Sequence, residues 1–170
     1  MKKMSKLVAS AIAIVSFAAT ANGQATATSS TTAVLVTPIS IAKTVDMHFG
    51  TVAASGTVGT VVLDYADGRT TTGGASLPAG STAQKTAVFV VTGEGTSSFS
   101  IAVPTAPITL TGSVTGTMTV SDFAADLGAA STLVAGSKTV KVKATLNVGV
   151  GQAAGTYTNA SGLFVTVNYN

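Results

Sequence analysis

The stretch Val140–Val148, with the sequence VKVKATLNV, alternates apolar and polar side chains along its whole length. Successive side chains of a β-strand point to opposite faces of a sheet, so a period of two residues predicts a strand with one buried and one solvated face. This is the clearest strand pattern in the chain, and it indicates an all-β fold.

The last residues, Leu163–Asn170, follow the same period to the end of the chain. The face that we expect to be buried carries Leu163, Val165, Val167 and Tyr169. A free C-terminus usually frays unless a sheet holds it. An apolar face that continues to the penultimate residue therefore predicts that the C-terminus is paired inside a sheet.

Similar short alternating segments recur along the chain, about nine in all, and no stretch of about 12 residues has a helical period. Threonine, which favours the pleated surface, is frequent throughout. The sequence predicts an antiparallel β-sandwich with Greek-key connections, Ig-like in the loose sense. A closed barrel is the alternative, and a β-helix is disfavoured because no fixed repeat period occurs.

Turn residues place the connections between these segments. Asp67-Gly68 predicts a tight turn. We expect a hairpin turn at Gly93–Gly95 and a single helical turn within Ser121–Ala130. Glycines after Val148 predict a break before a final hairpin, which Asn159–Gly162 would lengthen.

The N-terminal residues 1–25 are predicted to be a cleaved signal peptide. A short apolar run, Leu7–Phe17, follows a start that carries three lysines, and it is too short for a membrane-spanning helix. Small residues fit cleavage after Ala21 or after Ala25. We expect an exported protein, in the periplasm, at the cell surface or in the medium, with no membrane span after cleavage.

The predicted mature chain, residues 26–170, suits one β-sandwich domain, with 26–33 as a flexible arm. Removing the three lysines of the signal peptide leaves six basic and six acidic residues, so the mature net charge is zero. The chain therefore has no excess charge that would favour nucleic acid. It has no cysteine, which excludes a disulfide or a zinc–thiolate site.

Few residues suggest chemistry. His48 with Asp46 is conceivable as part of a hydrolase triad, but the chain has no nucleophile elbow, and a solvated His is the preferred interpretation. Four acids could supply oxygen ligands to calcium, but their spacing is not that of an EF-hand, and turn residues are the simpler interpretation. These four are Asp64, Asp67, Asp122 and Asp126.

Three further patterns have ordinary explanations. The basic cluster Lys138, Lys141 and Lys143 is typical of a solvated face with lysines that protect a sheet edge, and without interleaved aromatics it does not favour nucleic acid. Gly93–Gly95 is not followed by a helix that could hold a phosphate. Asn159-Ala160-Ser161 matches a glycosylation acceptor, which is a common three-residue match. We predict no catalytic residue, no cofactor and no metal.

Several phrases together resemble a family of secreted bacterial β-domain proteins that is classed as a domain of unknown function. They are TPISI at 37–41, DMHFGTV at 46–52, VTGE at 91–94, GTMTV at 116–120, ATLNVG at 144–149, AGTYT at 154–158 and VTVNY at 165–169. The resemblance covers nearly all of the mature chain. Its motifs are structural, so it implies a fold and no activity.

The C-terminal strand is also similar, more weakly, to that of chaperone–usher pilin subunits. Such subunits often end in an alternating strand with a penultimate Tyr and a Gly upstream, for which Tyr169 and Gly155 are the counterparts. This likeness implies pairing with a periplasmic chaperone or self-assembly through added strands. The chain departs from it in having no cysteine and no row of large apolar residues in 26–33.

These observations favour a non-enzymatic surface or fimbrial subunit that assembles by strand pairing. The residues expected to carry that pairing are Leu163, Val165, Val167, Tyr169 and Gly155. The alternative is a secreted monomeric binding module for glycan, which the lack of tryptophan disfavours because sugar platforms usually use aromatic faces. A hydrolase is the third hypothesis, and the inventory of residues makes it the weakest.

Overall fold

The computed structural model describes residues 23–80 and 83–170. Residues 23–34 are exposed and contain no helix or strand, and residues 35–170 form a compact unit of their own. Most of the predicted signal peptide lies outside the described residues and stays a prediction. The described part of the chain has no apolar helix of membrane-spanning length.

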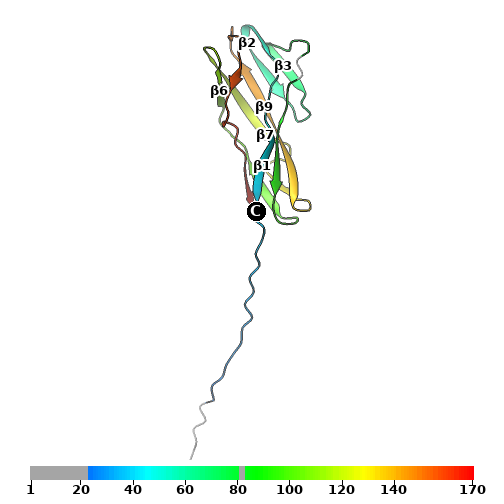
Figure 1. Ribbon diagram of the computed structural model, residues 1–170, viewed down its shortest axis with the longest axis vertical. Helices are drawn as coiled ribbons and strands as arrows, with labels where there is room; N and C mark the ends of the chain where they lie inside the picture. Colours follow the sequence, from blue (N-terminus) through cyan, green and yellow to red (C-terminus); the bar gives the residue numbers. More distant parts are fainter. Residues whose placement is uncertain (1–22, 81–82) are drawn as a thin grey trace, which may run out of the picture. The chain divides into compact units, whose positions relative to one another are not determined.

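Every regular element in the described residues is a strand, and every pairing is antiparallel, so the all-β prediction is confirmed (Figure 1). The strands are β1 (Ser40–Val45), β2 (Ala53–Leu63), β3 (Arg69–Ser76), β4 (Ala87–Thr92), β5 (Ser98–Ala102), β6 (Ile108–Gly112), β7 (Thr117–Ala125), β8 (Ala130–Thr132), β9 (Ser137–Val148), β10 (Tyr157–Thr158) and β11 (Thr166–Tyr169). The two shortest, β8 and β10, are too brief to leave an alternating pattern in the sequence.

The long strand β9 is the centre of the larger, eight-stranded sheet. It contains the stretch Val140–Val148 that predicted the fold. One of its edges pairs with β7, and β6 and β10 continue the sheet on that side. Its other edge pairs with two strands in succession, β4 along Ser137–Val142 and β2 along Ala144–Val148.

Strands β2 and β4 therefore behave as two halves of one interrupted strand. Both run antiparallel to β9, and they meet beside Lys143. The interruption contains β3, which pairs with the outer edge of β2, and the segment 77–86. The first strand, β1, pairs with the outer edge of β4. Figure 1 shows β2 and β3 at one end of the sheet and β1 towards the other.

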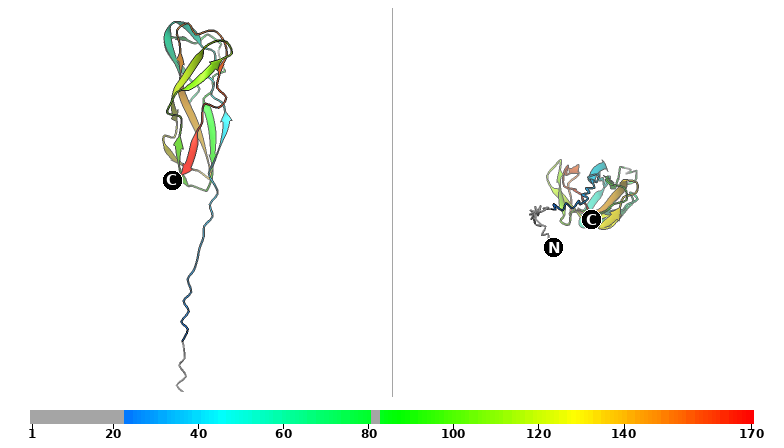
Figure 2. Two further views of the ribbon diagram at one scale, coloured as in Figure 1. Left: turned by 90° about the vertical axis from the view of Figure 1, so that its left-hand side faces the viewer. Right: turned by 90° about the horizontal axis from the view of Figure 1, so that it is seen from below.

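A second, three-stranded sheet with the order β11-β5-β8 completes the sandwich-like arrangement. Figure 2 shows β11 in red in the same part of the unit as β1, in cyan. One continuous apolar core lies between the sheets. It includes Phe99, Ile101 and Val167 from the smaller sheet, and Val91, Val140 and Val142 from the larger one.

The single turn predicted within Ser121–Ala130 is not a helix: residues 126–129 form a turn in which the N–H of Gly128 donates to the carbonyl oxygen of Ala125 at 3.3 Å. Strand β7 continues to Ala125, with a bulge between Ser121 and Ala124 where Asp122 has a positive φ of 54°. The bulge shifts the phase, so the buried residues are Met118, Val120 and then Phe123. A bulge of this kind inserts a residue without ending the strand. In the sequence it breaks the two-residue alternation in the same way as a turn, so the two cannot be distinguished there.

Two predicted hairpins are also wrong. Gly93–Gly95 joins β4 to β5, which lie in different sheets, so this turn is a crossover. After β9, strand β10 pairs with β6 and β11 pairs with β5, so no final hairpin forms. Turn residues show where the chain reverses, but they do not show which strand it then meets. The turn at Asp67-Gly68 is confirmed, because Leu63 and Arg69 are paired on either side of it.

Candidate functional site

The C-terminal strand lies inside a sheet, with the alternation that the sequence predicts. Its paired part, Thr166–Tyr169, is shorter than the pattern and lies against β5. Val167 is buried, with 8% of its surface exposed, and Val165 and Tyr169 are partly buried against the core. Leu163 is partly buried as well, before the paired residues begin.

The hydroxyl group of Tyr169 joins three segments at the base of this strand. It donates to the carbonyl oxygen of Thr37 at 2.7 Å and accepts from the backbone N–H of Glu94 at 2.6 Å. Gly93 makes this contact sterically feasible, because a Cβ there would lie 2.2 Å from the hydroxyl oxygen. We call this arrangement the Tyr169 clasp.

The carboxylate of Glu94 adds a further bond to the clasp. Its Oε2 accepts from the backbone N–H of Thr37 at 3.0 Å. This hydrogen bond holds the pKa of Glu94 below its ordinary value. The two backbone groups of Thr37 are thus bound by Tyr169 and Glu94, and the chain on the N-terminal side of Thr37 starts from a fixed point.

Two neighbouring strands have an outer edge without a strand partner among the described residues. Strand β1 ends the larger sheet and β11 ends the smaller one. The two strands approach each other, and we call the region between them the seam. Apolar side chains on both sides of the seam, among them Ile41 and Val165, are only partly buried. An open edge with matching side-chain pockets is the feature to which an added strand binds.

Gly155 lies away from these residues. It follows β9 and sits against Ser113 and Val114, where the backbone N–H of Thr156 donates to Ser113 Oγ at 3.1 Å. This corner belongs to β6 and β10 in the larger sheet, whereas β11 belongs to the smaller one. The structure therefore brings Val165, Val167 and Tyr169 together and places Gly155 elsewhere.

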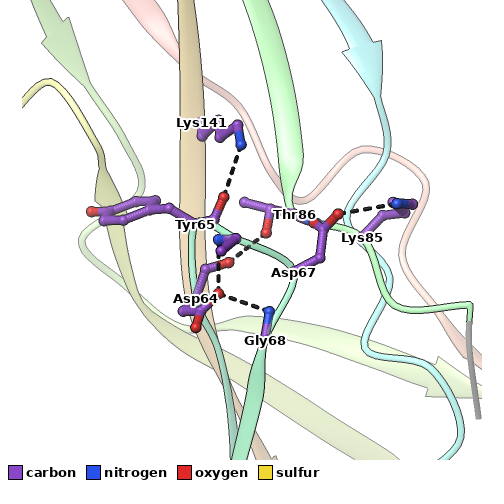
Figure 3. Close-up of polar contacts among 8 residues, drawn as sticks. Asp64, Tyr65, Asp67, Gly68, Lys85, Thr86 and Lys141 are labelled. Atoms are coloured by element: carbon purple, nitrogen blue, oxygen red, sulfur yellow. Dashed lines mark hydrogen bonds and ion pairs between the residues drawn. The ribbon is translucent and has the colours of Figure 1, made fainter.

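Asp64 and Asp67 stabilise the place where β2 and β4 meet (Figure 3). Asp64 Oδ1 accepts from the backbone N–H groups of Ala66 and Gly68, both at 2.7 Å, which closes the β2–β3 turn. Asp67 Oδ1 accepts from the N–H of Thr86 at 2.7 Å, and its Oδ2 pairs with Lys85 at 3.0 Å. These contacts lower the pKa of Asp67, and the hydrogen bond from the backbone of Thr86 contributes most.

Further bonds connect the same place to β9. The buried Thr86 donates through Oγ1 to the carbonyl oxygen of Asp64 at 2.5 Å, and Lys141 Nζ donates to that of Tyr65 at 3.0 Å (Figure 3). Lys143 Nζ lies 5.2 Å from the centre of the Tyr65 ring, within the range of a cation–π contact. Burial, and then the charge of Asp126, raise the pKa of Tyr65. We call this set the β2–β4 junction.

The remaining acids and the histidine also have structural contacts. His48 forms an isolated bridge with Lys85, and its Nδ1 accepts from the N–H of Gly50 at 2.8 Å, while Asp46 pairs with Lys43. Asp126 Oδ1 accepts from the N–H of Lys141 at 2.9 Å. Within 23–80 and 83–170, no group of three or more acids or histidines is arranged to hold a metal ion.

The basic cluster divides between the two faces of β9. Lys141 and Lys143 alternate with the buried residues Val140, Val142 and Ala144, whereas Lys138 has the same parity as Val140. The interpretation as one solvated face therefore applies to two of the three lysines. In the glycosylation-type motif Asn159-Ala160-Ser161, the Nδ2 of Asn159 donates to the carbonyl oxygen of Thr109 at 2.8 Å. The Oδ1 of Asn159 accepts from the backbone N–H of Ser161, which closes a turn.

One feature was not predicted from the sequence: a face of neutral hydroxyl groups on the outer side of the larger sheet. One row across five strands consists of residues paired in register, namely Thr72, Thr60, Asn147, Thr119 and Thr109. The signal was present, because threonines alternate with the buried residues of β2 and β7 and with the partly buried Ile108 and Leu110 of β6. Without the strand order, however, nothing shows that they form a row.

The comparisons with known proteins place the chain in a family. Residues 39–169 match the family model described as a domain of unknown function, DUF4402. The chain belongs to this family, as the sequence motifs indicated. No curated protein and no solved structure matches the chain.

Proposed function

We propose that the protein is a non-enzymatic, exported structural subunit of the bacterial surface, of the fimbrial or pilin-like kind, that assembles by strand pairing. The observation that carries this proposal is the seam between β1 and β11, where two open strand edges flank partly buried apolar side chains. A strand added there gains backbone hydrogen bonds from an edge and buries apolar surface at once.

The N-terminal segment of a second copy is the strand that this proposal adds. The exposed fractions of Val34, Leu35 and Val36 are 83%, 100% and 54%, although large apolar residues are usually buried. Valine also favours strands. These three residues precede Thr37, which the Tyr169 clasp holds. Consecutive exposed apolar residues promote aggregation of a monomer, but in a polymer they can be buried against the neighbouring subunit.

The remaining site chemistry agrees with a structural role. Asp64, Asp67 and His48 bind backbone groups or close turns. The predicted signal peptide supplies the route of export. A periplasmic chaperone that covers the seam before assembly is the partner that this function requires.

The test compares Leu35→Asp with the mature wild type, residues 26–170. Leu35 is fully exposed, so the substitution leaves the stability of the monomer within about 0.5 kcal/mol. We expect the wild type to form fibres in negative-stain electron microscopy and a high-mass fraction in size-exclusion chromatography. Leu35→Asp is expected to remain monomeric.

Thr28→Asp is the matched control, because it adds the same charge to the same segment outside the apolar triplet. It should assemble like the wild type. A wild type that stays monomeric at high concentration, and on cells that express it, would contradict the proposal. So would assembly of Leu35→Asp at the wild-type level.

A further inference from the structure

We propose that the hydroxyl face of the larger sheet is a binding site for an extended, uncharged polysaccharide. This inference goes beyond the proposed structural role and does not depend on assembly. It rests on the register of five neighbouring strands. Thr60 is paired with Thr72 on one side and with Asn147 on the other, and Thr119 is paired with Asn147 and with Thr109.

Two flanking rows extend the face. Beside the first row lie Thr70, Val62, Thr145 and Ser121, and on its other side lie Thr111, Thr117 and Thr158. These positions alternate with core residues such as Val61, Met118 and Leu146, so they belong to the outer side of the sheet. Neighbouring strands are about 4.8 Å apart, so five strands offer a polar row about 19 Å wide.

A shallow depression lies over the middle of this face. Its volume is about 460 Å³, and its lining includes Val58, Thr60, Thr117, Thr119 and Asn147. Val58, which is 66% exposed, stands at one side of it. Gly59 lets β3 approach here, since a Cβ on it would lie 2.2 Å from the backbone nitrogen of Ala75. Val58 is thus an apolar side chain beside the polar groups of the depression.

Hydrogen bonds within the face orient its polar groups. Thr60 Oγ1 and Thr72 Oγ1 lie 2.6 Å apart, so one hydroxyl donates to the other. The Nδ2 of Asn147 donates to Ser121 Oγ at 3.1 Å and to the carbonyl oxygen of Thr119 at 3.3 Å. Both of its N–H groups are therefore used on β7, and its Oδ1 remains an acceptor for a ligand hydroxyl.

The chemistry of the rows selects the class of ligand. All their members except Val62 are Thr, Ser or Asn, and none is charged. Lys143 has the same parity as Thr145 and lies beyond the row that contains Thr145, so an ion pair with an anionic polymer would form outside the three rows. Hydroxyl and amide groups that both donate and accept match the hydroxyl groups of a neutral sugar chain. The width of the row favours an extended chain that contacts several strands at once.

The lack of aromatic side chains predicts that a single site binds weakly. Each hydrogen bond to the ligand replaces one to water, so its net contribution is small. Display of many copies on one fibre would raise the overall avidity by a large factor without any new contact. The face therefore suits a subunit that occurs in many copies, although the monomer is sufficient to test it.

The experiment is affinity electrophoresis of the mature chain that carries Leu35→Asp, which is expected to stay monomeric and leaves the hydroxyl face unchanged. Native gels contain soluble mixed-linkage β-glucan, and a pull-down on microcrystalline cellulose accompanies them. This chain serves as the wild type for the hydroxyl face, and the variants below are made in it. We expect retardation by β-glucan or retention on cellulose, unchanged from low salt to 0.5 M NaCl. The double variant Thr60→Val, Thr119→Val keeps side-chain shape and removes two central hydroxyls. Its binding should be about 5- to 50-fold weaker.

Thr139→Val is the matched control, because Thr139 is an exposed residue of β9 beyond Lys141 and outside the rows. It should bind like the wild type. Should the double variant melt at a lower temperature, the single variant Thr72→Val at an exposed position gives the same test. No binding of the wild type to either polysaccharide would overturn the proposal. So would equal binding by the valine variants, or binding that salt abolishes.

Discussion

Strands β9 and β11 alternate in the same way along the sequence but differ in what surrounds them. One edge of β9 is paired with β4 along Ser137–Val142 and with β2 along Ala144–Val148, and its other edge is paired with β7 along Val142–Asn147. From Val140 to Val148 its inward side chains are almost fully buried. Strand β11 is paired with β5 on one edge only. Of its inward side chains Val167 is buried, whereas Tyr169, and Val165 just before the strand, are partly exposed.

This difference separates two roles of an alternating strand. A strand with both edges paired has satisfied its backbone groups and contributes to stability alone. A strand with one open edge retains donors and acceptors that another chain can use. The open edge of β11 could therefore take part in assembly, as proposed above, whereas the paired stretches of β9 could not. Substitutions in the two strands test this difference.

The largest expected effect is in β9. Leu146 is 4% exposed and lies between its cross-strand neighbours Val61 and Val120 in the core. Leu146→Ala removes buried methyl groups and leaves a cavity, so it should cost about 2–5 kcal/mol of unfolding free energy. Urea denaturation followed by circular dichroism measures this. A cost below about 1 kcal/mol would mean that β9 is not the centre of the core.

A smaller effect is expected in β11. Val167→Ala loses two buried methyl groups next to an open edge, where the neighbouring chain can relax, so it should cost about 1–2 kcal/mol. Thr166→Ala is the control, because Thr166 is exposed and its loss should change stability by about 0.5 kcal/mol or less. Equal costs for the two variants would show that the terminal strand is not anchored as the structure has it.

The Tyr169 clasp gives the third test, because it is the polar link at the end of β11. Tyr169→Phe keeps the ring and removes the hydroxyl that binds Thr37 and Glu94. We expect a loss of about 1 kcal/mol, since the groups left behind are partly accessible to water. Amide hydrogen exchange at Glu94 should become faster in the variant, whereas exchange in β9 should not change. Faster exchange in β9 would mean that the clasp is part of the central core.

The sequence predicted strands well where a single face is buried along many residues. The β9 stretch and the inward parity of Val165, Val167 and Tyr169 follow from a period of two, and the Asp67-Gly68 turn follows from its two turn residues. Family membership was also predicted from the motifs. These features are local, because each depends on neighbours in the chain or on the face that a side chain takes.

Features that depend on strand order could not be predicted in this way. The crossover at Gly93–Gly95, the separation of β10 from β11 and the row through Thr60 and Asn147 require knowledge of which strands are neighbours. The bulge at Asp122 changes parity inside a strand, and no period reveals it. The pairing of β9 with β2 and β4 in succession is likewise a property of the assembled sheet.

The smallest expected effect is on the pH dependence of stability. It compares the β2–β4 junction, beside β9, with the Tyr169 clasp at β11. Asp67 and Glu94 both have a lowered pKa, because each carboxylate accepts a backbone N–H, from Thr86 and Thr37 respectively. A lowered folded-state pKa means that the ionised form is favoured in the folded protein. The resulting stability is present above the unfolded-state pKa and is lost as the pH falls through the folded-state pKa.

Asp67→Asn should therefore remove part of the acid sensitivity of unfolding. Asp67 is paired with Lys85 at a half-exposed position, so the difference from wild type near pH 7 should be about 0.5 kcal/mol or less. It should disappear at the lowest pH, where Asp67 is protonated in both states. Glu94→Gln should act locally, through faster exchange of the Thr37 amide at neutral pH. If Asp67→Asn instead showed the same acid sensitivity as the wild type, Asp67 would not stabilise the junction through its charge, and the contacts of Thr86 would have to do so alone.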